Sequence, residues 1–260
     1  MLTLSVCCIA ALVAGFVDSI AGGGGMITQP AMLLVGVPPH AILGTNKFAT
    51  TLGTGLALVN FARSNLVVWR VAALGVVFSL LGAYIGAELA LLVDSVTLGK
   101  VIVALLPLGL LLTLLPKKER KPPAPGVALA GGANLHGLAF WLLVPFASAL
   151  VGVYDGFFGP GTGSVFILVF HWLLGMGLIH ASATAKVFNL ASNVGALVGF
   201  LWAGQVLFAL ALPMAACNML GNWLGSRLAI RQGSGLVRRI LAVTLSLLVL
   251  TLIWHSFFRA

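Results

Sequence analysis

The stretch AGFVDSIAGGGGMITQP, residues 14–30, decides how this chain folds, because it occurs again in altered form as VGVYDGFFGPGTGSVFI, residues 151–167. Each copy holds one acidic residue and a cluster of glycines inside an otherwise apolar run. Further along, each copy is followed by a lysine, Lys47 in HAILGTNKF and Lys186 in HASATAKVF. Apolar spans that recur with charges and helix breaks at matching places are typical of a membrane transporter built from an internal duplication.

The composition is that of a polytopic membrane protein. Of the 260 residues, 60% are hydrophobic and 7% are charged, and the mean hydropathy of +1.14 lies outside the range of soluble domains. A bilayer core needs about 20 helical residues per span, so the apolar runs predict an all-α fold of about eight to ten membrane segments in a lipid bilayer. The net charge of +9 does not indicate a nucleic-acid partner, because the few basic residues lie between apolar spans and set orientation.

A short polar segment divides the chain into its predicted parts. The prolines and charges of PKKERKPPAPG, residues 116–126, cannot lie in lipid, and the basic residues predict that this segment is cytoplasmic. We therefore expect a first transmembrane repeat at 1–115, a linker at 116–137 and a second repeat at 138–260.

Charges around a third matched pair of segments predict that the two repeats have opposite orientations. GAYIGAELA at 82–90 aligns with GNWLGSRLA at 221–229, and the glycines of both predict close helix packing. Arg63 places the start of the first of these spans inside the cell, whereas Arg227 places the end of the second inside. We therefore expect an inverted repeat with both chain termini outside the cytoplasm.

Two apolar runs, from Gly25 to Pro38 and from 164 to 178, are too short to cross a membrane. Each covers about a dozen residues, or about 18 Å of helix, and Pro30 is expected to interrupt the first. Because glycines precede both, we expect half-helices or re-entrant hairpins, whose free N–H groups and positive helix ends attract anions. Glycine also serves close packing, but these clusters exceed that need. The predicted binding residues here are Gly23, Gly24, Gly25, Gly161, Thr162 and Gly163.

Charged residues at matched positions beside these breaks are a second sign of function. Ionisable groups in a bilayer cost about 2.5–3.5 kcal/mol on insertion scales and mark functional sites by default. Asp18 and Asp155 either cap helix starts or couple transport to protons, and the sequence leaves both interpretations open. Lys47 and Lys186 either snorkel to an interface or bind substrate. Polar neighbours favour substrate binding, and the predicted set includes Thr45, Asn46, Asn189 and Asn193.

Other site chemistries find little support in the sequence. His40 and His180 match across the copies but lack Asp, Glu or Cys at metal spacing, so we expect no metal or cofactor. Cys7, Cys8 and Cys217 form no CxxC pair and are expected to act as small hydrophobes. An enzyme would need a nucleophile with a base, a carboxylate dyad or a metal set, and none is evident. A passive anion channel using the same cavity stays an alternative to a carrier.

The paired signatures GFVDSIAGGGGMIT with GTNKF, and YDGFFGPGTGS with ATAKVFNLASN, resemble those of the TauE/SafE family of membrane permeases, and of its YfcA-like branch in particular. The resemblance covers essentially the whole chain, with Gly44 standing where the family usually has Ala. Members are bacterial inner-membrane proteins implicated in moving sulfite, sulfonates and related sulfur-containing anions, often outward. The resemblance therefore implies a multi-pass inner-membrane permease for a small anion, and leaves substrate, direction, coupling ion and oligomeric state open.

Overall fold

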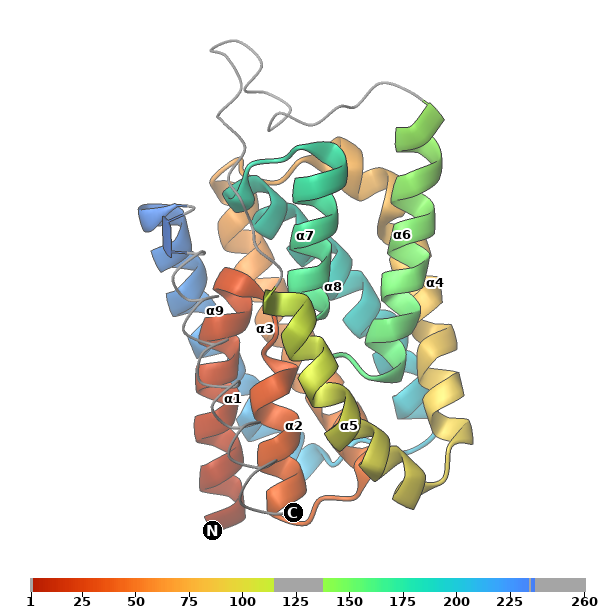
Figure 1. The fold of residues 1–260 in the computed structure, drawn as a ribbon. Helices are drawn as coiled ribbons and strands as arrows, with labels where there is room; N and C mark the ends of the chain where they lie inside the picture. The colour runs from red at the N-terminus through yellow and green to blue at the C-terminus, as the bar shows by residue number, and fades with distance from the viewer. Residues whose placement is uncertain (1, 115–137, 234, 237–260) are drawn as a thin grey trace.

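A computed structural model describes residues 2–114, 138–233 and 235–236 of the chain. Within these ranges all regular structure is helical (Figure 1), which confirms the predicted all-α class. The predicted linker at 116–137 and the chain end at Ala260 lie outside the described residues. In chain order the helices are α1 (Leu2–Ala21), α2 (Gly25–Leu34), α3 (Pro39–Arg63), α4 (Trp69–Leu92), α5 (Ser95–Leu114), α6 (Leu138–Phe157), α7 (Thr162–Leu174), α8 (Leu178–Trp202) and α9 (Phe208–Gln232).

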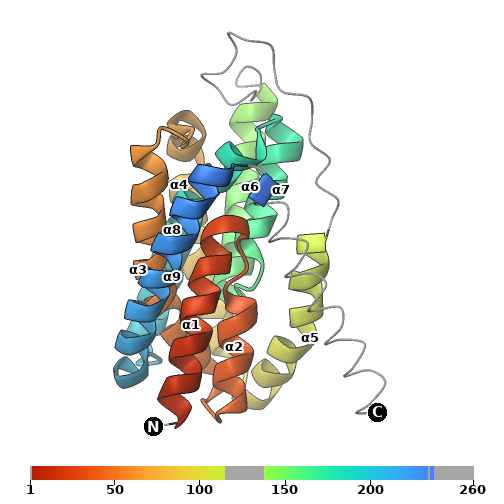
Figure 2. The same cartoon turned by 90° about the vertical axis from the view of Figure 1, so that its left-hand side faces the viewer.

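The helices pack side by side in one bundle (Figure 2). Four described segments are long and apolar enough to cross a membrane by length and composition, namely Leu2–Ala21, Trp69–Leu92, Phe140–Phe157 and Leu178–Trp202. The helices α3 and α9 have 25 residues each, or about 38 Å of helix. Many of their polar side chains are buried inside the bundle. Large apolar side chains are exposed around the bundle, among them Ile85, Leu89, Leu142, Leu150 and Leu212.

Each glycine cluster forms the turn of a helical hairpin. The α1–α2 hairpin turns after Ala21 and the α6–α7 hairpin turns after Phe157. Figure 1 shows them entering the bundle from opposite ends, so that their tips meet inside it. Gly22 and Gly161 have φ angles of +78° and +84°, a left-handed conformation that favours glycine. The predicted short helices are confirmed, with 10 residues in α2 and 13 in α7.

Pro30 does not interrupt α2, contrary to the expectation from the sequence. It lies inside the helix, which continues to Leu34. Proline removes one backbone hydrogen bond, but its fixed φ near −65° is itself helical, so the remaining bonds and the neighbouring helices maintain the turn.

Hydrogen bonds join the two hairpin tips to each other. Ser164 Oγ donates to the carbonyl oxygen of Ala21 at 2.8 Å, and Gln29 Nε2 donates to that of Phe158 at 2.9 Å. An added Cβ on Gly22 would lie 2.4 Å from the backbone N of Ser164, so glycine is required where the two backbones meet. The tips therefore form one contact region inside the bundle.

Glycines in the third matched pair of segments bring helices into backbone contact, as predicted. A Cβ added at Gly86 would lie 2.1 Å from the carbonyl oxygen of Val153, and one at Gly221 would lie 2.1 Å from that of Leu12. The first contact holds α4 against α6, and the second holds α9 against α1. Each hairpin is therefore attached to one long helix by close packing.

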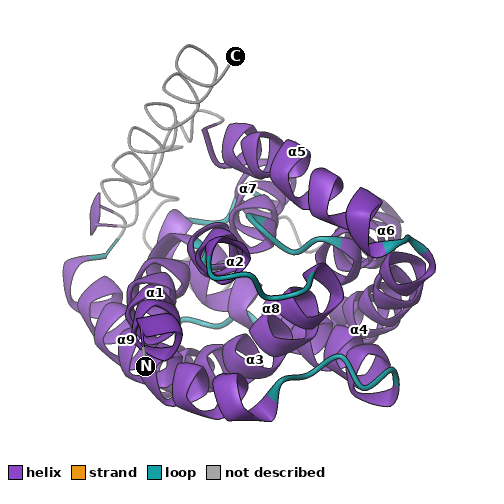
Figure 3. Cartoon of the chain, turned by 90° about the horizontal axis from the view of Figure 1, so that it is seen from below, coloured by secondary structure: helices purple, strands orange, loops and turns teal. Residues whose placement is uncertain are grey.

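The helices α4 and α9 run in opposite directions (Figure 1). His40 Nε2, at the start of α3, lies 3.0 Å from the carbonyl oxygen of Val93, just past the end of α4. Leu207, just before α9, donates its backbone N–H to Thr45 Oγ1 at 3.1 Å. The end of α4 and the starts of α3 and α9 therefore lie at the same end of the bundle, which is seen along the helix axes in Figure 3.

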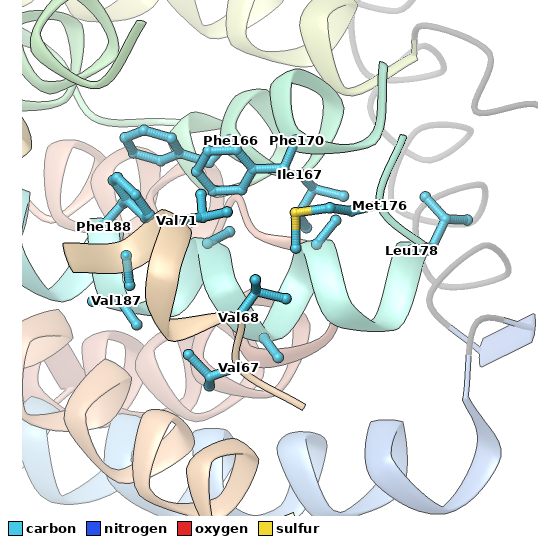
Figure 4. Close-up of a cluster of buried hydrophobic side chains, with 14 of the residues drawn as sticks. Val67, Val68, Val71, Phe166, Ile167, Phe170, Met176, Leu178, Val187 and Phe188 are labelled. Atoms are coloured by element: carbon cyan, nitrogen blue, oxygen red, sulfur yellow. The ribbon is translucent and has the colours of Figure 1, made fainter. Parts of the chain in front are cut away.

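An aromatic cluster fixes α7 to α8 (Figure 4). The ring of Phe188 lies 5.3 Å from that of Phe166 and 4.8 Å from that of Phe170, and all three side chains are buried. Val68 and Val71 at the start of α4 join the same core. Because α8 also carries Lys186, this core sets the position of α7 relative to that lysine.

Candidate functional site

Each buried lysine pairs with the aspartate of the other matched stretch. Lys47 Nζ lies 2.7 Å from Asp155 Oδ2, and Lys186 Nζ lies 3.0 Å from Asp18 Oδ2. The lysines are 2% and 0% exposed, so neither snorkels to an interface. The two ion pairs therefore cross between the first and second halves of the chain.

The aspartates lie in the last turns of α1 and α6, not at helix starts. Asp18 Oδ1 accepts a bond from the backbone N–H of Gly24 at 3.5 Å, the outer limit of a hydrogen bond, so its capping role is weak. A carboxylate at a helix C-terminus faces the negative end of the helix dipole, which is unfavourable. The lysine ammonium groups offset this repulsion, which explains why charges of both signs are buried together.

Amide and hydroxyl groups complete the polar surroundings of Lys47. Its ammonium donates a second bond to Asn193 Oδ1 at 3.1 Å. Thr28 Oγ1 donates to Asn46 Oδ1 at 2.5 Å, and Thr50 Oγ1 donates to the carbonyl oxygen of Asn46 at 2.8 Å. These bonds hold the side chains of α2, α3 and α8 in place around one ammonium group.

A polar cavity of about 30 Å³ lies between the hairpin tips, α3 and α8. That volume holds no more than about two water molecules, so a larger anion enters only if the surrounding groups move apart. The helices α2 and α7 begin in its wall, which places the positive ends of their dipoles at the cavity. The backbone N–H groups of Met26 and Thr162 already donate to the carbonyl oxygens of Gly23 and Gly159. The lining residues are Asp18, Gly23, Gly24, Gly25, Asn46, Lys47, Thr50, Asp155, Gly159, Thr162, Gly163, Asn189 and Asn193.

Most of the residues predicted for the site line this cavity, but three do not. Lys186 lies behind Asp18, Gly161 is at the tip but outside the wall, and Thr45 bonds to Leu207 as described above. Sequence reasoning also missed Thr50 and Gly159. Thr50 had a usable signal, because it lies one helical turn beyond Lys47 and therefore shares its face of α3.

The described residues show no alternative metal site, since no three His, Cys, Asp or Glu side chains in them could hold an ion. His40, one of the matched histidines, contacts the carbonyl oxygens of Ala90 and Val93 and the hydroxyl of Ser95. It therefore secures the corner between α4 and α5. Cys7 is buried and packs in an apolar cluster.

Comparison with known proteins assigns the chain to a family. The family profile described as "Sulfite exporter TauE/SafE" matches residues 7–252. The chain belongs to the TauE/SafE family. This assignment confirms the resemblance noted in the sequence, and it makes the protein a membrane transporter with a small-molecule substrate.

Individual relatives of this TauE/SafE protein carry the same general description. It is 42% identical to the probable membrane transporter protein ORF9 of Sinorhizobium sp, over 90% of this chain and 86% of the relative. It is 34% identical to the probable membrane transporter protein YfcA of Escherichia coli strain K12, over 98% and 91%. A probable membrane transporter of Haemophilus influenzae is 38% identical over 89% and 87%. No solved structure gives a significant match.

Proposed function

We propose that this TauE/SafE protein carries small sulfur-containing anions, such as sulfite or organosulfonates, across the bacterial inner membrane through the cavity between the hairpin tips. The observation that carries the proposal is the Lys47–Asp155 ion pair in the cavity wall. An ammonium, amide N–H groups and helix N-termini all donate hydrogen bonds, which is what the oxygens of a sulfite or sulfonate accept. The family description, which names a sulfite exporter, agrees with this ligand class.

We also propose that residues 1–115 and 138–260 are inverted repeats joined by a cytoplasmic linker at 116–137. Hairpins that enter from opposite ends, the opposed directions of α4 and α9, and the crossed ion pairs all support this arrangement. It predicts that a reporter fused after Ala260 is active outside the cytoplasm, whereas one inserted near Pro122 is not. Activity of both reporters on the same side would favour parallel repeats instead.

Anion binding at Lys47 requires its ion pair to open. The two lysines and two aspartates carry charges that cancel, so an entering anion meets the Asp155 carboxylate as well as the ammonium. Leaving a buried charge without its partner costs about 3–5 kcal/mol. A proton on Asp155 removes that cost, because Lys47 can then pair with the anion and no charge is left unpaired. Proton and anion binding are thereby coupled at one site.

The test is flux of radiolabelled anions in proteoliposomes that contain the full chain. The panel comprises sulfite, several organosulfonates, thiosulfate and small carboxylates, each with and without a pH gradient. We expect saturable flux of a sulfur oxyanion that the pH gradient drives, and its loss in Lys47→Met. The matched control is Lys100→Met, which removes an exposed lysine of α5 outside the cavity. Flux that does not depend on the pH gradient and does not saturate would indicate a channel. Preference for carboxylates over the sulfur oxyanions would overturn the proposed substrate class.

A further inference from the structure

A second and larger cavity, of about 370 Å³, lies where α3 and α9 end. It is separate from the hairpin cavity and shares no lining residue with it. Arginine side chains dominate its wall, which is formed by Asn60, Arg63, Ser64, Arg227, Ile230 and Arg231. This end of the bundle is the one opposite the end of α4, and the charge pattern predicts it to be cytoplasmic.

The three arginines of this cavity have no carboxylate partner among the described residues. Asp18 and Asp155 pair with the lysines, and Asp94 accepts backbone N–H bonds at the start of α5, at the other end of the bundle. Arg227 lies over the Trp223 ring, 4.0 Å from its centroid, which orients the guanidinium without neutralising it. Arginines near a helix C-terminus also interact favourably with the negative end of the helix dipole. That effect does not explain why three of them line one cavity.

Exposed apolar side chains extend from the arginines toward the middle of the bundle. Val59 lies one helical turn before Arg63 on α3, and Leu224 lies one turn before Arg227 on α9, with Leu220 a further turn away. Side chains three or four residues apart share a helix face, so Arg63 and Arg227 each follow exposed apolar side chains on the same face of their helix. A dissolved ion needs no such strip, whereas the acyl chains of a lipid do.

We propose that this cavity binds the phosphate group of an anionic phospholipid from the cytoplasmic leaflet, with the acyl chains along Val59, Leu220 and Leu224. The planar guanidinium fork matches phosphate oxygens in pairs. Each basic residue near an anionic lipid surface raises affinity about fivefold. The bound lipid spans α3 and α9, which are bridged beneath the cavity by the hydrogen bond from Asn60 Nδ2 to Ser226 Oγ at 2.8 Å.

The test is a lipid titration of the full chain, purified in a neutral detergent. Phosphatidylglycerol and phosphatidylcholine with identical chains are compared by the shift in Tm and by lipid retained in native mass spectrometry. We expect a saturable rise in Tm with phosphatidylglycerol, and an affinity reduced on the order of 100-fold when Arg63, Arg227 and Arg231 are all replaced by Gln. Arg70→Gln removes an exposed arginine at the same end of the bundle that does not line the cavity, so it should reduce affinity less than the loss of any one cavity arginine does.

A single-arginine variant and inorganic phosphate distinguish lipid binding from misfolding and from binding of a free anion. Should the triple variant fail to fold, Arg231→Gln alone replaces an exposed side chain in the last turn of α9 and should reduce affinity about fivefold. Equal phosphatidylglycerol affinity in this variant and the unmodified protein would overturn the proposal, as would an equal Tm shift from inorganic phosphate alone. Lys47→Met should keep lipid binding, because the site does not depend on the transported anion.

Discussion

The Lys47–Asp155 and Lys186–Asp18 pairs occupy matched positions in the sequence but differ in what surrounds them. Lys47 and Asp155 both line the cavity, and Lys47 also donates to an asparagine amide. Lys186 is kept out of the wall, because it donates to both the carbonyl oxygen and the carboxylate of Asp18. In the proposed function, Lys47 therefore exchanges its partner for a ligand, whereas Lys186 ties α8 to the end of α1.

The aspartates of the two pairs differ in how far water reaches them. The Asp18 side chain is 13% exposed and that of Asp155 is 5% exposed. Loss of Lys186 would therefore leave a carboxylate that water can partly reach, whereas loss of Lys47 would leave one that water reaches less. In an inverted repeat, the conformation open to the other side would exchange these two environments. Mutations of the two pairs distinguish fixed roles from exchanged ones.

The largest expected effect is that of Lys47→Met. The change keeps the length of the side chain but leaves Asp155 without its cation. Removing one partner of a buried ion pair costs about 3–5 kcal/mol. Initial rates of anion flux should fall on the order of 100-fold or more, while the protein still inserts and purifies. Lys47→Arg should restore only part of the rate, because a planar guanidinium differs in shape from an ammonium. Normal flux in Lys47→Met would remove this lysine from the site.

Asp155→Asn should separate coupling from binding. Asparagine keeps the shape of the side chain but cannot take up a proton, so accumulation driven by a pH gradient should be lost while exchange of anion across the vesicle membrane persists. Asp18→Asn, the matched change in the other pair, should retain more of the gradient-driven accumulation, since its lysine does not reach the cavity. Normal gradient-driven accumulation by both variants would exclude a proton role for either aspartate.

Lys186→Met should affect stability more clearly than transport. Breaking this pair removes the bonds that tie α8 to α1. The expected loss of stability is about 1–3 kcal/mol, less than for a fully buried pair, because water can partly reach Asp18. Thermal unfolding in detergent should show a lower Tm, and adding Asp18→Asn should recover part of it. A loss of flux as large as that of Lys47→Met, with an unchanged Tm, would instead mean that the two pairs exchange roles during transport.

Asn193→Ala should have the smallest effect on transport. It removes one hydrogen bond to the Lys47 ammonium, at about 0.5–1.5 kcal/mol, so the KM for the anion should rise about twofold to tenfold with little change in stability. The matched control is Asn60→Ala, which lies at the arginine cavity and should leave the KM unchanged. An equal rise in both variants would indicate a general loosening of the bundle.

Properties carried by short stretches were predictable from the sequence. Hydropathy and run length predicted an all-α membrane protein with two short helices, because crossing a bilayer sets a minimum length for an apolar helix. The glycines of GAYIG and GNWLG predicted backbone contact, and the buried charges with their glycine-rich neighbours predicted most of the cavity wall. These inferences need only the local chemistry of a segment and the apolar nature of its surroundings.

Tertiary structure alone decided which of these residues meet. Asp155 pairs with Lys47 because α6 is packed on α4 and the hairpin tips touch, and both contacts join residues that are far apart in the sequence. Thr45 is a close neighbour of Lys47 in the sequence, yet it bonds to the start of α9, because nearby residues of a helix project in different directions. Lys186 matches Lys47 in the sequence but is covered by Asp18. A local pattern identifies which groups are costly to bury, whereas the packing of distant helices determines which partner offsets that cost.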